Sequence, residues 1–117
     1  MSGTSLDGVD GVLADFSEGR IHILGHATAA LPQALRETFH ALNTPGENEL
    51  HRAALAGNAL AEVYSAVVHS LLKDSGTPSH IVAAVGAHGQ TVRRLPRLDG
   101  GVGYSIQINQ PALLAEL

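Results

Sequence analysis

The sequence predicts an α/β domain in which helices cover a mixed sheet, in the order strand, strand, helix, helix, strand, strand, helix. Three observations lead to this prediction. Short runs rich in Val, Ile and Leu have the length of strands, and longer stretches repeat apolar residues at the three-and-four spacing of a helix. Gly, Pro and Asn separate these segments. A chain of 117 residues can bury a modest core and is expected to form one domain.

The chain begins with a hairpin followed by a helix. Residues 9–16 and 20–27 are expected to be antiparallel strands, because the small and polar residues 17–19 between them suit a turn. A helix is expected from Pro32 to about Leu42, since proline tolerates the first turn and apolar residues then recur at helical spacing.

The clearest periodic signal predicts a long amphipathic helix. Apolar residues follow the helical spacing from Leu50 to Leu72, and Gly76 and Pro78 end the pattern. Gly57 lies inside the apolar stripe, where glycine costs about 1 kcal/mol relative to alanine. We therefore expect another backbone to approach the helix closely at Gly57.

The last third of the chain is expected to contain two strands and a final helix. Residues 81–87 read IVAAVGA, a nearly continuous apolar run typical of a strand buried on both faces. Residues 104–108 alternate polar and apolar side chains, which predicts a second strand. Pro111 then begins a helix that continues to Leu117.

Composition excludes several classes of function. The net charge of −4 disfavours a nucleic-acid partner or an anionic membrane surface. The absence of cysteine excludes disulfides, thiolate zinc sites and a cysteine nucleophile. No apolar stretch is long enough to span a bilayer, and the N-terminus does not resemble a signal peptide. A soluble cytoplasmic protein is therefore expected.

The first candidate site is the segment GTSLDGVD at residues 3–10. Glycines let backbone N–H groups point at an anion, and the hydroxyls of Thr4 and Ser5 can donate to phosphate oxygens. The carboxylate of Asp7 or Asp10 can hold hydrated Mg²⁺. No lysine follows as in a Walker A loop, and taken alone the segment is equally a polar β-turn.

Two further segments end predicted strands. GAHGQT at residues 86–91 places His88 and Gln90 where open α/β sheets bind ligands, and the glutamine amide suits sugar hydroxyl and amide groups. The alternative is a strand corner with a surface histidine. SIQINQP at residues 105–111 repeats the arrangement, although it also suits an ordinary helix cap. A basic cluster at residues 93–97 is expected to face water or to flank an anionic ligand.

The three segments together resemble anhydro-N-acetylmuramic acid kinase. The resemblance rests on MSGTSLDGVD at residues 1–10, GAHGQTV at 86–92, and SIQI at 105–108 followed by a proline-initiated LLAE helix. It spans the whole chain in the same order. In the family a Gly-Asp or Gly-Asn pair is more usual where Asn109 and Gln110 stand.

The resemblance implies a ribonuclease H-like first lobe of the actin, hexokinase and Hsp70 superfamily, with residues 1–117 as a single N-terminal lobe truncated at both ends. It implies a kinase that uses ATP and Mg²⁺ to open 1,6-anhydro-N-acetylmuramic acid and phosphorylate O6 in cell-wall recycling. ATP phosphate and Mg²⁺ would contact Gly3, Thr4, Ser5, Leu6, Asp7, Gly8, Val9 and Asp10, and the sugar would contact His88 and Gln90. The full-length protein is compatible with a homodimer.

Other functions remain open at this point. Family members are longer and begin with a strand that leads into MSGTS, and their general base and adenosine pocket lie beyond the residue matching Leu117. The chain alone is therefore expected to be inactive. One alternative is another sugar kinase of the same superfamily. The other is a binding module that recognises a sugar or nucleotide without transforming it.

Overall fold

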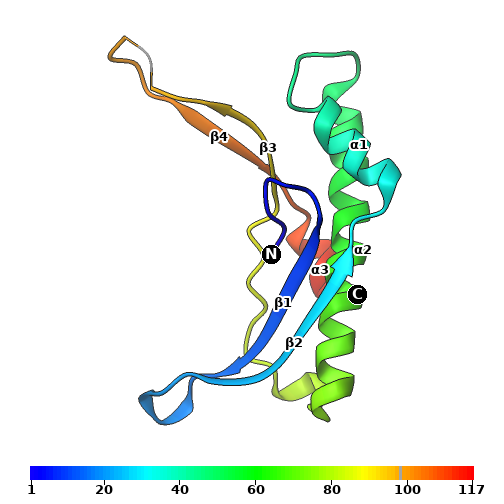
Figure 1. Cartoon of the computed structure of the whole chain (residues 1–117), viewed down its shortest axis with the longest axis vertical. Coiled ribbons are helices and arrows are strands. Elements are labelled where there is room, and N and C mark those ends of the chain that lie inside the picture. Colours follow the sequence, from blue (N-terminus) through cyan, green and yellow to red (C-terminus); the bar gives the residue numbers. More distant parts are fainter. Residues whose placement is uncertain (98) are drawn as a thin grey trace.

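The computed structural model describes residues 1–97 and 99–117. Its elements are strand β1 (Gly8–Asp15), a 3-10 turn (Ser17–Gly19), strand β2 (His22–Ala30), helices α1 (Gln33–Ala41) and α2 (Glu49–Ser75), a second 3-10 turn (Ser79–Ile81), strands β3 (Gln90–Leu95) and β4 (Tyr104–Ile108), and helix α3 (Pro111–Glu116). Figure 1 shows α2 running along the length of the molecule with α1 and the β1–β2 hairpin beside it, whereas the β3–β4 hairpin projects away from α2.

The expected N-terminal hairpin and the two helices expected after it are confirmed. β1 and β2 pair antiparallel from Gly8 opposite Ala30 to Asp15 opposite His22. α1 begins at Gln33, directly after Pro32 and one residue later than the sequence predicted. α2 ends at Ser75 and is capped by Gly76, whose left-handed backbone lets its N–H donate to carbonyls of the last helical turn.

The core lies where α1 and the two hairpins pack against α2. Leu60 of α2 and Phe39 of α1 are almost fully buried, as are Val9 of β1 and Val92 of β3. These aliphatic and aromatic side chains come from four different elements, so burial of the α2 stripe holds the elements together. The β1–β2 hairpin and the β3–β4 hairpin therefore share one core.

The predicted strand at residues 81–87 is wrong, and so is a single mixed sheet. In the described residues, 82–89 form no regular structure, and the two hairpins are separate two-stranded sheets. A strand requires backbone pairing with a neighbour, and this apolar run has no β-ladder partner here, so that half of Val85 is exposed. The third strand of the chain is instead β3, directly after that run.

The expected close approach at Gly57 is confirmed. A Cβ added there would lie 3.4 Å from Ile108 Cγ2 and 3.5 Å from the carbonyl oxygen of Asn109. Glycine thus lets the end of β4 pack directly on α2. The described helices include none with both the length and the hydropathy needed to cross a bilayer.

Candidate functional site

The first motif folds into a tight turn anchored by a leucine. The N–H of Leu6 donates to the carbonyl of Gly3 at 3.2 Å, and the side chains of Thr4 and Ser5 at the tip are exposed. Leu6 has a left-handed backbone with φ of 58°, a conformation that costs a non-glycine residue about 1–2 kcal/mol. Its side chain is buried in the core, and this burial offsets the strain. The two hydroxyl groups are therefore presented to solvent on a fixed turn.

The two carboxylates of the motif have different surroundings. Both Asp7 and Asp10 are exposed. The hydroxyl of Thr28 donates to Asp10 Oδ1 at 2.8 Å, and His26 Nε2 lies 3.7 Å from the same oxygen. Asp10 is thus oriented by β2, whereas Asp7 stands in the turn itself. Val9, between them in the motif, points into the core.

The second motif contributes one exposed and one buried polar side chain. His88 is exposed, whereas Gln90 is only 1% exposed. The Gln90 amide nitrogen donates to the Thr91 carbonyl at 3.3 Å, and Gln90 Oε1 has no hydrogen-bond partner among the described residues. A buried acceptor without a partner is costly, so the vicinity of Gln90 is a place where a ligand donor is favoured.

Buried and partly buried hydrogen bonds join the three motifs. The Ser2 hydroxyl donates to the Gly89 carbonyl at 3.3 Å and shares a hydrogen bond of 3.1 Å with the hydroxyl of Tyr64 on α2. The Asn109 side-chain amide donates to the Ala87 carbonyl at 2.7 Å. The structure therefore brings together segments that are far apart in the sequence.

Sequence reasoning missed Ser2 and Tyr64 as parts of this site. Tyr64 was expected only as a member of the apolar stripe of α2. Burial raises the pKa of the Tyr64 phenol, while its hydrogen bond to Ser2 acts in the opposite direction. The phenol thus remains a protonated hydrogen-bonding group at neutral pH. The hydroxyl group of Tyr64, which is polar within an otherwise apolar helical stripe, was the only feature of the sequence that pointed to this role.

Two cavities adjoin the motifs. One, of about 680 Å³, is lined by residues of the first and second motifs, including Gly3, Thr4 and His88, and by apolar residues of α2. The other, of about 530 Å³, is lined mainly by polar side chains: Thr4, Asn43, Gln90, Thr91, Arg94, Ser105 and Gln107. Hydroxyls, amides and one guanidinium suit a polar ligand that carries hydroxyl groups and a negative charge. A larger hollow beside α1, about 990 Å³, contains no residue of the three motifs.

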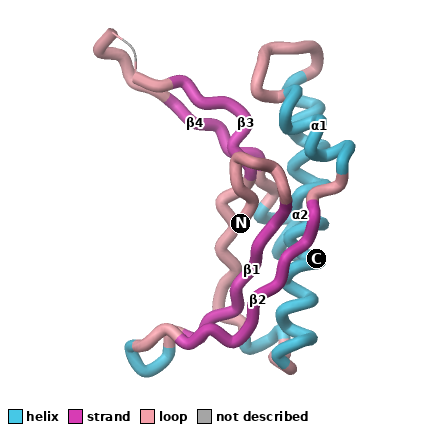
Figure 2. Tube along the Cα trace, viewed as in Figure 1, coloured by secondary structure: helices cyan, strands magenta, loops and turns pink. Residues whose placement is uncertain are grey.

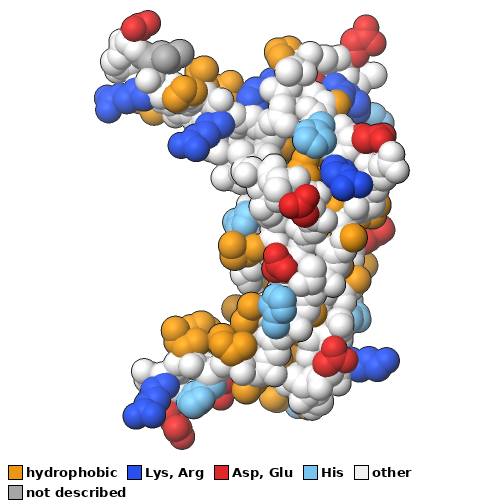
Figure 3. Space-filling view, viewed as in Figure 1, with side chains coloured by type: hydrophobic (Ala, Val, Ile, Leu, Met, Phe, Trp, Pro, Cys, Tyr) orange, Lys and Arg blue, Asp and Glu red, His pale blue; other side chains and the backbone are white. Residues whose placement is uncertain are grey.

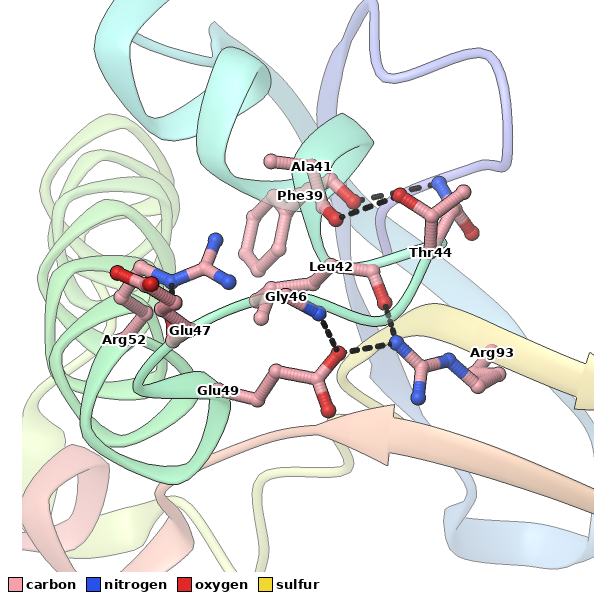
Figure 4. Close-up of polar contacts among 10 residues, drawn as sticks. Phe39, Ala41, Leu42, Thr44, Gly46, Glu47, Glu49, Arg52 and Arg93 are labelled. Atoms are coloured by element: carbon pink, nitrogen blue, oxygen red, sulfur yellow. Dashed lines mark hydrogen bonds and ion pairs between the residues drawn. The ribbon is translucent and has the colours of Figure 1, made fainter.

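Arg93 of the basic cluster does not face water. Its Nη2 atom donates to Glu49 Oε1 at 2.6 Å and to the Leu42 carbonyl at 3.0 Å (Figure 4). The hydrogen bond from Arg93 is the main cause that lowers the pKa of Glu49, and the Gly46 N–H donates to the same carboxylate. Arg93 therefore fastens β3 to the loop between α1 and α2, whereas Arg94 lines the polar cavity.

The site offers few ligands for a metal ion. No group of three or more His, Cys, Asp or Glu side chains comes together in the part of the chain that the structure describes. The two exposed carboxylates, Asp7 and Asp10, nevertheless fit Mg²⁺, because proteins usually hold this ion through one or two carboxylates together with substrate phosphates and water.

Known proteins match the chain over its whole length. A family model for anhydro-N-acetylmuramic acid kinase matches residues 1–117. Curated proteins of that name are 67% identical in Variovorax paradoxus (strain S110), 58% in Albidiferax ferrireducens and 54% in Cupriavidus pinatubonensis. Each alignment covers 100% of this chain but only 30–31% of the relative. The chain thus spans less than a third of the length of these relatives.

Proposed function

Because the chain belongs to the anhydro-N-acetylmuramic acid kinase family, we propose that it forms the first lobe of an ATP-dependent kinase, with the ribonuclease H-like fold of the actin-like superfamily. The whole enzyme hydrolyses the 1,6-anhydro bond of anhydro-N-acetylmuramic acid and phosphorylates O6, which yields N-acetylmuramic acid 6-phosphate. One observation supports this most directly: the phosphate-suited turn and the sugar-suited corner are joined by the Ser2 to Gly89 hydrogen bond.

The turn of the first motif is proposed to bind the phosphates of ATP. Backbone N–H groups at Gly3 and Gly8 and the exposed hydroxyls of Thr4 and Ser5 provide donors for phosphate oxygens. Leu6 and Val9 would contribute only through their backbone, because their side chains belong to the core. Phosphoryl transfer depends mainly on positioning and charge stabilisation, and a turn anchored in the core is suited to both.

Asp7 or Asp10 is proposed to hold Mg²⁺ together with ATP. When bound, this ion neutralises charge on the phosphate oxygens. Thr28 already fixes the Asp10 carboxylate, whereas Asp7 lies within the phosphate-suited turn. Asp7→Asn and Asp10→Asn therefore form a matched pair of variants that separates the two assignments.

His88 and Gln90 are proposed to contact the sugar. Gln90 Oε1 could accept from a sugar hydroxyl or amide, and His88 is exposed beside the same corner. During the reaction, water attacks the anomeric carbon and the bond from that carbon to the bridging oxygen breaks, while a base outside the three motifs takes the proton that the water loses. The freed oxygen receives the γ-phosphoryl group of ATP, and the bond from this group to ADP breaks, so that ADP leaves. We assign no general base to the three motifs, so these residues bind and orient rather than move the proton.

ADP release tests the proposed function directly. We expect 1,6-anhydro-N-acetylmuramic acid to stimulate ADP release by a chain extended to the length of its relatives, and not by the 117-residue chain. Asp7→Asn or Asp10→Asn should lower this turnover strongly in the extended chain. Stimulation by free N-acetylmuramic acid alone would indicate another sugar kinase. Sugar binding without turnover in the extended chain would indicate a binding module.

The proposed reaction indicates where the protein acts and which molecules it binds. An enzyme that consumes ATP is expected in the cytoplasm, with the anhydro amino sugar and ATP as its small-molecule partners and without a nucleic-acid or membrane partner. A homodimer of the whole protein is also proposed, and light scattering of the extended chain measures its mass.

A further inference from the structure

The guanidinium group of Arg93 lies where the end of α1 and the start of α2 meet β3. Its Nη2 atom donates to the carbonyl of Leu42, the residue that caps α1, and to the carboxylate of Glu49, the first residue of α2. A cation is favoured beside the carbonyl groups that end a helix and beside a carboxylate. One side chain of the β3–β4 hairpin therefore holds both ends of the α1–α2 loop, residues 42–48.

The contact between Arg93 and Glu49 is partly shielded from water. The Arg93 side chain is 24% exposed and that of Glu49 is 32% exposed. The Gly46 N–H also donates to Glu49 Oε1 at 3.1 Å, so the loop itself orients the carboxylate that Arg93 contacts. Within the described residues, no other side-chain hydrogen bond joins the β3–β4 hairpin to the α1–α2 loop. The relative position of these two segments thus depends on Arg93.

A β-bulge bends β3 immediately before Arg93. Thr91 pairs with Gln107 and Arg93 pairs with Ile106, so Val92 has no partner in the ladder. Val92 is only 4% exposed and belongs to the core, which fixes the bulge in place. A bulge bends its strand and redirects side chains, and bulges are common next to functional sites. Val92 and Arg93 together therefore set the angle at which the hairpin leaves the core.

Beyond the bulge, little packing holds the hairpin. Figure 2 shows β3 and β4 projecting from the rest of the molecule. The side chains of Leu95, Tyr104 and Ile106 are between 42% and 46% exposed. In the space-filling view of Figure 3, Lys and Arg side chains lie on this projecting part, next to the hollowed side of the molecule. The direction of the hairpin is consequently determined at its base, where Arg93 lies.

The polar cavity of about 530 Å³ is built from the segments that Arg93 joins. Asn43 of the α1–α2 loop lines it together with Arg94, Ser105 and Gln107 of the hairpin. Asn43 is itself fixed, because its side-chain amide donates to the carbonyl of Phe39 at 3.2 Å. A change in the angle of the hairpin would move its three polar side chains relative to Asn43. The width of the cavity therefore follows the contact between Arg93 and the loop.

We propose that Arg93 is a positioning residue for the ligand of the polar cavity, which under the proposed function, on which this inference rests, is the anhydro amino sugar. Arg93 acts through the hairpin and the loop and does not touch the ligand. The phosphate-suited turn is anchored separately by the buried side chain of Leu6, so ATP binding does not depend on Arg93. Loss of Arg93 should thus weaken the sugar site selectively.

Arg93→Met in a chain extended to the length of its relatives tests the proposal, because methionine keeps an apolar stem and removes every donor. We expect the KM for 1,6-anhydro-N-acetylmuramic acid to rise roughly tenfold and the KM for ATP to change by less than about twofold. Arg93→Lys, which keeps a charged donor, should restore part of the sugar affinity. Arg52→Met is the matched control, since the Arg52 Nε atom donates to the Glu47 carbonyl of the same loop at 2.8 Å. This variant should leave the KM for the sugar unchanged.

Glu49→Ala breaks the same contact from the helix side. It should also raise the KM for the sugar, and combining it with Arg93→Met should add little, because both changes remove one interaction. Circular dichroism identifies the variants that are folded under the assay conditions, and Glu49→Ala provides the test where Arg93→Met does not fold.

The results that would overturn the proposal are distinct from failure of the proposed function. A folded Arg93→Met enzyme that is less stable in urea but keeps the wild-type KM for the sugar would show that Arg93 has only a structural role. Equal rises in the KM for sugar and for ATP would also overturn the proposal. If the unsubstituted extended chain neither bound nor turned over the sugar, the proposed function would be refuted, and with it the ligand assigned to the cavity.

Discussion

Replacing Gly89 with alanine should destabilise the chain much more than the same replacement at Gly76. Both glycines have left-handed backbones, with φ of +78° and +67°, so alanine at either position carries a conformational cost of about 1–2 kcal/mol. Their surroundings differ. A Cβ at Gly76 would meet nothing within 4 Å, whereas at Gly89 it would overlap the Ile108 carbonyl oxygen and lie 2.8 Å from Asn109 Cβ.

The expected difference follows from this overlap. Carbon atoms in ordinary contact are ~3.5 Å apart, so the second and third motifs would have to separate by roughly 0.7 Å. Overpacking of this kind adds about 1–3 kcal/mol. We therefore expect a loss of about 1–2 kcal/mol for Gly76→Ala and about 2–5 kcal/mol for Gly89→Ala. The second value is a large part of a typical domain stability of about 5–15 kcal/mol.

Urea unfolding followed by circular dichroism measures both losses. Equal m-values for the two variants would show that each unfolds from a similarly compact state. If Gly89→Ala and Gly76→Ala lowered the free energy of unfolding equally, the close contact between the Gly89 corner and the end of β4 would be refuted. The conformational cost of a left-handed alanine would then account for both variants.

Three further predictions concern the core and the polar contacts. Leu60→Ala should lower the free energy of unfolding by about 2–5 kcal/mol, and an unchanged urea midpoint would contradict its full burial. Tyr64→Phe removes one of the two hydrogen-bond partners of the Ser2 hydroxyl and should cost about 0.5–1.5 kcal/mol. Additivity with Ser2→Ala in a double-mutant cycle would argue against the hydrogen bond between Ser2 and Tyr64. Because Arg93 lowers the pKa of Glu49, this ion pair stabilises the folded state fully above about pH 4.3, the ordinary pKa of a glutamate. The stabilisation is lost as the pH falls through the lower pKa that Glu49 has in the folded state. Glu49→Gln should therefore make stability less acid-sensitive in urea titrations from about pH 5 to pH 3, and an unaltered acid profile would contradict the pair.

Local chemistry was sufficient to predict most elements. The apolar spacing from Leu50 to Leu72 specified α2, because a helix of this period buries one continuous face. Pro32 marked the start of α1, and Gly57 indicated close packing that the end of β4 provides. The motif resemblance identified the family that the comparisons show. In each case the relevant signal lies within one turn, one helix face or one contiguous motif.

Tertiary structure decided the features that depend on a distant partner. The apolar composition of residues 81–87 indicated burial, but whether such a run becomes a strand depends on a neighbour with which its backbone can pair. The sequence placed Arg93 in a basic cluster on the surface, whereas in the structure it donates hydrogen bonds to Glu49 and to the Leu42 carbonyl. Residue type and spacing thus determined the local elements and the candidate motifs. Which polar side chains and backbone groups form hydrogen bonds across long sequence distances depends on the tertiary structure, because these groups meet only where the segments pack against α2.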